Sequence, residues 1–157
     1  MRFSPRVAIL FVSSLVATSA YAQTTFNVGD DASLRAALSA AVGGDTIVLT
    51  NFIGLTADLP AIQAGGGGGT VTIDGAGFGI SGGGLYRGLV VGSFSGGPAL
   101  TVDLSNITIH DTVATGGVGG SGAAGGGGGA GLGGALFIGT GATVNVSNVT
   151  LAGNSAI

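Results

Sequence analysis

The chain has 157 residues, of which 45% are hydrophobic and only 7% charged, and it contains 35 glycines and no cysteine. So much glycine and so few charges exclude an ordinary helical domain, because each helical Gly costs about 1 kcal/mol and a helix needs a polar outer face. Lysine is absent, and the four arginines are outnumbered by seven aspartates. This balance excludes the positive surface that a nucleic-acid partner requires.

Residues 1–22 have the pattern of a secretory signal peptide. Two arginines precede an apolar stretch of about ten residues, and Ala20 and Ala22 are small residues at the two positions that a signal peptidase reads. The apolar stretch is too short for a membrane-spanning helix, which needs about 20 residues. We therefore expect cleavage between Ala22 and Gln23 and an exported product. That product keeps two arginines and all seven aspartates, so its formal charge is −5.

Residues 23–44 are expected to form an N-terminal cap. The pattern indicates a short strand and loop over residues 23–31 and an amphipathic helix over residues 34–41, which a Gly pair ends. Asp31 and Ser33 are the residues expected to cap this helix. We expect the helix to cover the open end of the strands that follow.

Residues 45–157 are predicted to be stacked turns of β-structure. Residues 45–50 and 70–74 read as the first strands. Residues 100–114 then recur as residues 142–156, at an offset of 42. Apolar residues alternate within each copy, which is the pattern of strands with one buried face. An internal repeat of such strands indicates a solenoid whose turns pack on one another.

Each copy of the repeat contains a predicted corner. The alternation slips by one residue at Ser105-Asn106 and again at Ser147-Asn148, so a corner joins two short strands there. Asn106 and Asn148 also begin Asn-x-Thr glycosylation sequons, but a stack of asparagine amides explains them more simply. Val146 is expected to face inward, into the core.

The turns are predicted to contain 23–29 residues, with loops of variable length. Residues 116–134, which we call the Gly-rich tract, include 13 glycines in 19 residues, and their removal reduces the 42-residue interval to 23. We expect this tract to be a flexible insertion that does not pack into a core. No closing cap is recognisable after the last turn, so we expect the sequence to be the N-terminal part of a longer protein.

The order of these motifs resembles one family. GGDTIVL after a short helix, then VTIDGAG, LTVDLSNITI and GGALFIGTGATVNVSNVTLAGNSA, is similar to the start of a bacterial autotransporter passenger. The resemblance covers residues 23–157 and implies an all-β fold, a right-handed parallel β-helix of the pectate-lyase-like type. It also implies surface display through a C-terminal outer-membrane barrel, which lies outside the sequence.

The residues that could carry chemistry are few. His110-Asp111 is the only His beside an acid, but the equivalent residues one repeat later are Ala152-Gly153, so a solvated corner is the simpler interpretation. Alignment of aspartates from different turns could provide a calcium site or the paired acids of a glycosidase; the candidates are Asp45, Asp58, Asp74, Asp103 and Asp111. Outside the predicted cap, Arg87 is the only cation of the exported product. Four aromatic residues could form a sugar platform, although packing in the core or anchoring of loops is the commoner use of scattered aromatic residues: Phe78, Tyr86, Phe94 and Phe137.

These patterns favour a non-enzymatic scaffold over a catalyst. We expect no catalytic, cofactor or metal site, and a surface protein that contacts glycans or proteins of a host or neighbouring cell. The alternative is a carbohydrate-active β-helix enzyme, a polysaccharide lyase or hydrolase. Convergence of three acids, or of Asp with Arg, in one groove would favour that alternative.

Overall fold

The computed structural model describes residues 22–63, 68–92, 99–117 and 129–157. Within these ranges the chain is rich in strands and has one helix, α1 (Asp31–Ala40). The strands are β1 (Thr25–Val28), β2 (Thr46–Leu49), β3 (Ile53–Gly54), β4 (Gly69–Asp74), β5 (Gly79–Ser81), β6 (Leu89–Val91), β7 (Leu100–His110), β8 (Val113–Ala114), β9 (Leu136–Ile138), β10 (Ala142–Ala152) and β11 (Ser155–Ala156). The predicted signal peptide lies almost entirely outside the described residues, whereas Ala22 and Gln23 are exposed just before β1.

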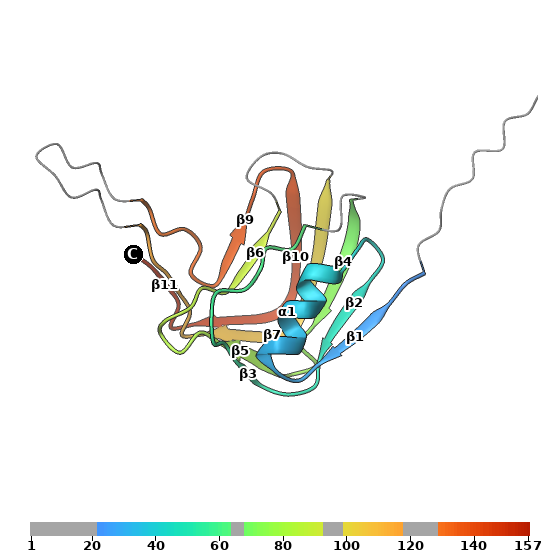
Figure 1. Cartoon of the computed structure of the whole chain (residues 1–157), viewed down its shortest axis with the longest axis horizontal. Helices are drawn as coiled ribbons and strands as arrows, with labels where there is room; N and C mark the ends of the chain where they lie inside the picture. The colour runs from blue at the N-terminus through green and yellow to red at the C-terminus, as the bar shows by residue number, and fades with distance from the viewer. Residues whose placement is uncertain (1–21, 64–67, 93–98, 118–128) are drawn as a thin grey trace, which may run out of the picture.

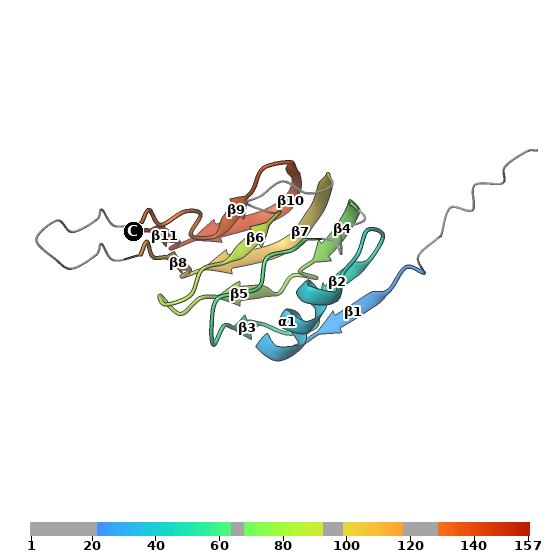
Figure 2. The same ribbon diagram turned by 45° about the horizontal axis from the view of Figure 1, so that its top comes forward.

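All the strand pairs are parallel. The largest sheet has the order β1-β2-β4-β7-β5-β3, and β10 adds to the free side of β7. Two small sheets pair β6 with β9 and β8 with β11. One face therefore runs β1, β2, β4, β7 and β10, and a second face runs β3, β5 and the end of β7, as Figures 1 and 2 show. Pairing begins with β1 on β2, one strand earlier than the predicted start at residues 45–50.

The repeat sets the register of the last two long strands. Ten residues of β10 align with β7, from Ala142 on Leu100 to Ala152 on His110, at the offset of the sequence repeat. Between β4 and β7 the predicted turn length is too short by two residues, because Ile73 aligns with Leu104, 31 residues later. The interval between these strands is thus longer than the predicted turn, and the connecting segment absorbs the difference.

The long strands bend at a corner formed by a single asparagine. The first half of β7 pairs with β4 and its second half with β5, so one strand belongs to two faces. Asn106 has a φ of 50° at this point, and Asn148 has 53° at the equivalent point of β10. Asparagine tolerates this left-handed conformation better than most residues. The corner falls where the alternation of the sequence slips.

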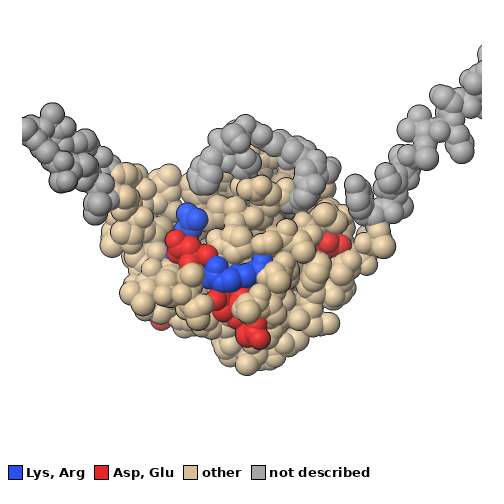
Figure 3. Space-filling view, viewed as in Figure 1, with Lys and Arg blue, Asp and Glu red and all other residues tan. Residues whose placement is uncertain are grey.

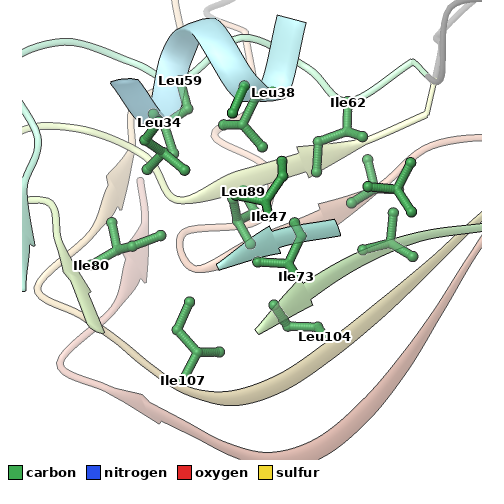
Figure 4. Close-up of a cluster of buried hydrophobic side chains, with 14 of the residues drawn as sticks. Leu34, Leu38, Ile47, Leu59, Ile62, Ile73, Ile80, Leu89, Leu104 and Ile107 are labelled. Carbon is green, nitrogen blue, oxygen red and sulfur yellow. The ribbon is translucent and has the colours of Figure 1, made fainter. Parts of the chain in front are cut away.

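The hydrophobic core lies between the two faces of the sheet that meet at the asparagine corner, and beneath α1. Buried aliphatic side chains come from nearly every segment, including Ile47, Ile73 and Leu104, which are aligned along the first face (Figure 4). Leu34, Ala37 and Leu38 of α1 are buried against this cluster. Figures 1 and 2 show α1 across the end of the core beside β1 and β2. The helix therefore covers one end of the stack, as expected.

The helix begins earlier than the sequence interpretation placed it. Asp30 is the N-cap, where its side chain accepts a 2.7 Å hydrogen bond from the Ser33 backbone N–H, and Ser33 Oγ accepts one from the Asp30 N–H. This capping box replaces the predicted cap at Asp31, which lies inside the helix and pairs with Arg35. Adjacent aspartates made the two positions indistinguishable in the sequence.

The opposite end of the stack is open. Val146 aligns with Leu104, which is 1% exposed, yet Val146 itself is 61% exposed. The predicted burial of Val146 is therefore wrong, although the residue occupies the register position of a core residue. Nothing in the described part of the chain stacks on β10 to cover it.

The Gly-rich tract packs where it leaves and rejoins the strands. The Gly116 N–H donates to the Ile157 carbonyl at 2.7 Å, and a Cβ at Gly131 would clash with the backbone of Ala114 and Ile157. These glycines permit close backbone contacts, contrary to the expectation that the tract does not pack. Residues 118–128 of the tract lie outside the described residues.

Candidate functional site

The predicted corner residues form a ladder of side-chain hydrogen bonds. Asn148 Nδ2 donates to Asn106 Oδ1 at 3.0 Å, and Asn106 Nδ2 donates to Asp74 Oδ1 at 3.0 Å. The stacked amides expected from the repeat are therefore present, and Asp74 extends the stack by one strand. Ser105 and Ser147 align beside them in the sheet. Such a ladder stabilises the corner and provides no chemistry of its own.

The aspartates considered as a catalytic or calcium cluster are dispersed. Asp45 is buried, and its two oxygens accept from the Thr24 N–H at 2.8 Å and the Val42 N–H at 2.9 Å. Asp103 instead accepts from Asn145 Nδ2 at 2.7 Å. Among the described residues, no three acidic, His or Cys side chains are placed to hold a metal ion. The carboxylates mainly hold the backbone and neighbouring strands in place.

His110 and Asp111 form an exposed pair. His110 Nδ1 lies 2.9 Å from Asp111 Oδ2, and their side chains are 35% and 59% exposed. The register neighbours of His110 are Ser81 on β5 and Ala152 on β10. Within the described residues, Ser81 Oγ has a hydrogen bond from the Gly83 N–H and none with His110. The pair is thus a polar corner at the end of β7.

The structure does bring one Asp and one Arg together in a pocket. The pocket has a volume of about 220 Å³ and is partly open. Its lining comes from three connections and from strands β8 and β9, and we call it the Arg87 pocket: Asp58, Arg87, Ala114, Thr115, Ala130, Leu132 and Phe137. Phe137 is half-buried on β9, whereas Leu132 is 55% exposed. A small cavity therefore has an apolar wall beside a charged pair.

The charged pair is held in place through the backbone. Asp58 Oδ1 accepts a 3.0 Å hydrogen bond from the Arg87 N–H, while Arg87 Nε lies 3.8 Å from Asp58 Oδ2. Arg87 Nε is buried and has no hydrogen-bond partner within the described residues. The side chains of Arg87 and Asp58 are 37% and 55% exposed, so their ion pair contributes at most about 1 kcal/mol to stability.

A second arginine connects this pair to the cap helix. Arg35 Nη1 donates to the Asp58 carbonyl at 2.6 Å, its Nη2 donates to the Ala57 carbonyl, and its Nε lies 2.9 Å from Asp31 Oδ2. Burial alone would raise the pKa of Asp31, but the hydrogen bonds from Arg35 and Thr56 outweigh it, so the pKa is lowered. In Figure 3, basic and acidic side chains lie next to each other in a band on this face. The segment carrying Asp58 is thus fixed from the helix side.

Of the three described aromatic residues that could form a sugar platform, only Phe137 lines the pocket. Phe78 packs edge-on against Phe52, with ring centroids 5.7 Å apart, and Tyr86 packs against the core. Phe94 lies outside the described residues. Phe78, Tyr86 and Phe137 therefore do not form a shared platform.

Sequence reasoning singled out Arg87 and Phe137 but did not connect them with Asp58. Asp58 and Arg87 are 29 residues apart, which is within the predicted turn length, so their side-by-side position was available as a signal. The contribution of Ala114, Ala130 and Leu132 to the pocket could not be predicted from the sequence, because it depends on how the connections fold over the strands.

No protein-family model, no curated protein and no solved structure matches the chain. In the part of the chain that the structure describes, no helix has the length and apolar character needed to cross a membrane.

Proposed function

We propose that the chain is an exported, surface-displayed scaffold of the right-handed parallel β-helix type, which mediates adhesion to glycans or proteins of a host or neighbouring cell. The observation that carries this proposal is the constant parallel register of β2, β4, β7 and β10 despite connections of different length. A stack of this kind keeps its core while its loops vary. It is therefore suited to presenting surface features rather than to closing around a substrate.

Handedness follows from a general rule of sheet topology. Each of these strands reaches its parallel neighbour through a crossover, and such crossovers are right-handed in about 98% of cases. The resemblance of residues 23–157 to autotransporter passengers supports the same architecture and the surface location.

The use of the aspartates supports a scaffold. Asp30 caps the helix, Asp31 pairs with Arg35, and Asp45 holds two backbone N–H groups. Asp74 and Asp103 bond to asparagines on neighbouring strands. Hydrolysis of a glycosidic bond generally requires two carboxylates about 5–10 Å apart across one site. The Arg87 pocket is lined by one carboxylate, that of Asp58.

The second candidate is a carbohydrate-active enzyme. The meeting of Asp58 and Arg87 in one pocket favours it, because glycosidase or lyase chemistry usually needs either paired acids or a cationic group near the substrate. The Asp58 carboxylate already accepts a hydrogen bond from the Arg87 backbone N–H, which fixes its position as a hydrogen-bond acceptor in the pocket.

An adhesion assay and a cleavage assay separate the two functions. Beads coated with the exported chain should attach to cultured cells more than beads coated with the heat-unfolded chain. Incubation with a panel of polysaccharides should release neither reducing ends nor unsaturated products. Polysaccharide cleavage that is lost in the Asp58→Asn variant would show that the chain is an enzyme and would contradict the scaffold proposal. Equal attachment of both bead types would contradict adhesion by the folded chain.

A further inference from the structure

The Arg87 pocket offers a hydrogen-bond donor and an acceptor side by side. The Arg87 side chain is 37% exposed, and its guanidinium carries N–H donors besides the buried Nε. The Asp58 carboxylate, 3.8 Å away, is more than half exposed and has lone pairs beyond the one used by the Arg87 N–H. A ligand that both donates and accepts at neighbouring atoms would satisfy the two groups together. Adjacent hydroxyls have this property.

The rest of the pocket is apolar or small. Phe137 and Leu132 provide carbon surface, Ala114 and Ala130 leave space, and Thr115 adds one hydroxyl. Ligand sites generally combine such a wall with a few placed polar groups. The volume of about 220 Å³ is below the roughly 300–1,000 Å³ of sites for drug-sized ligands, so the pocket suits one ring.

Charge decides between a neutral and an anionic ring. The Arg87–Asp58 pair has no net charge, and the chain as a whole has a formal charge of −3. A carboxylate on the ligand would be attracted by Arg87 but repelled by Asp58, whereas a neutral polyol can bond to both without separating them.

We propose that the Arg87 pocket binds a single neutral pyranose ring of a surface glycan. Two adjacent ring hydroxyls bond to Arg87 and Asp58, and the apolar C–H face of the ring packs against Phe137. This assignment rests on the proposed adhesive function, since it names the class of partner that the scaffold contacts.

The test is saturation-transfer NMR on the full exported chain with methyl glycosides of neutral hexoses and the corresponding uronic acids as probes. At least one neutral glycoside should receive saturation, and its uronic acid should bind several-fold more weakly. Asp58→Asn and Phe137→Leu should each weaken binding about tenfold. Asp103→Asn is the control, because it removes the same charge from a residue that bonds to Asn145 and does not line the pocket. Melting temperatures within a few degrees of the unmodified chain show that the variants fold.

Three results would overturn the assignment: no transfer to any neutral glycoside, tighter binding of the uronic acids, or unchanged binding by folded Asp58→Asn and Phe137→Leu. The bead assay separates this failure from failure of the scaffold function. If beads coated with these two variants attach as well as unmodified beads, the pocket assignment fails and the scaffold stands. If unmodified folded beads attach no better than heat-unfolded ones, the adhesive function itself fails.

Discussion

At the residue scale, register position and burial are separate properties in this protein. Leu104 and Val146 occupy the same position on neighbouring strands and point to the same side of the sheet, but only Leu104 is covered. The sequence pattern reports the side to which a residue points. It does not report whether another layer lies above it.

Truncating these two residues should therefore have different effects. Leu104→Ala removes fully buried methyl groups and leaves a cavity, so it should lower the free energy of unfolding by about 2–5 kcal/mol. Val146→Ala, at a side chain that is 61% exposed, should change it by less than about 1 kcal/mol. Urea denaturation of both variants measures the difference. Equal losses would show that β10 is covered in solution.

At the element scale, α1 is attached to the strands through its acidic N-terminal turn. The backbone hydrogen bond from Ser33 and then its hydroxyl lower the pKa of Asp30, and the pKa of Asp31 is lowered against the effect of burial by Arg35 and Thr56. Two acids at a helix N-terminus also interact favourably with the helix dipole. The cap therefore depends on ionised carboxylates.

This dependence predicts a loss of stability in acid. Because both folded-state pKa values lie below the ordinary value of 3.8, the unfolded chain binds more protons, and the contribution is complete only above that value. It should be lost as the pH falls from about 5 through the folded-state pKa values. The urea midpoint should thus drop between pH 6 and pH 3, and the double variant Asp30→Asn/Asp31→Asn should drop less. The same drop in both proteins would contradict the assignment of these two carboxylates.

The described ends of the Gly-rich tract pack against the rest of the chain. The Gly129 N–H donates to the Gly117 carbonyl at 2.8 Å, so the two residues that flank residues 118–128 are adjacent. Gly131 and Gly134 lie against the backbone of Ile157 and Ser155. The boundary between insertion and packed chain thus falls inside the tract.

Replacing residues 118–128 by a short Gly-Ser connector should shift the melting temperature by only a few degrees, because loop-closure entropy changes by about 0.6 kcal/mol per doubling of length. Replacing residues 116–134 should cost more, since it removes the contacts with Ile157 and Ser155. Circular dichroism melts of the two deletions test this difference. A larger loss from the shorter deletion would contradict the division.

At the scale of the whole molecule, the sequence predicted what repeats and missed what depends on the connections. The copy of residues 100–114 at 142–156 determines the pairing of β10 on β7, and the break in alternation locates the corner at Asn106 and Asn148. The pairing of Ile73 with Leu104 was missed, because no sequence repeat relates β4 to β7 and no sequence pattern fixes the length of the connection between them. The Arg87 pocket was missed for the same reason, since its lining comes from segments whose packing is not periodic.

The long strand β10 stacks in parallel on β7, the strand one repeat earlier, in a fixed register. Disulfide trapping tests it directly, because the chain has no native cysteine. Asp103 and Asn145 are register partners with hydrogen-bonded side chains. Strands about 4.8 Å apart place cysteines at these positions within the Cα separation that a disulfide allows.

Mild oxidation of the folded double variant Asp103→Cys/Asn145→Cys should therefore give a crosslink, detected by mass spectrometry of the digested chain. Asp103→Cys/Ser147→Cys is the matched control, since a shift of two residues, about 6.6 Å along the strand, places its cysteines beyond disulfide reach. We expect a crosslink in the first variant and free thiols in the second. Free thiols in the first, or equal crosslinking in both, would contradict the stacked register.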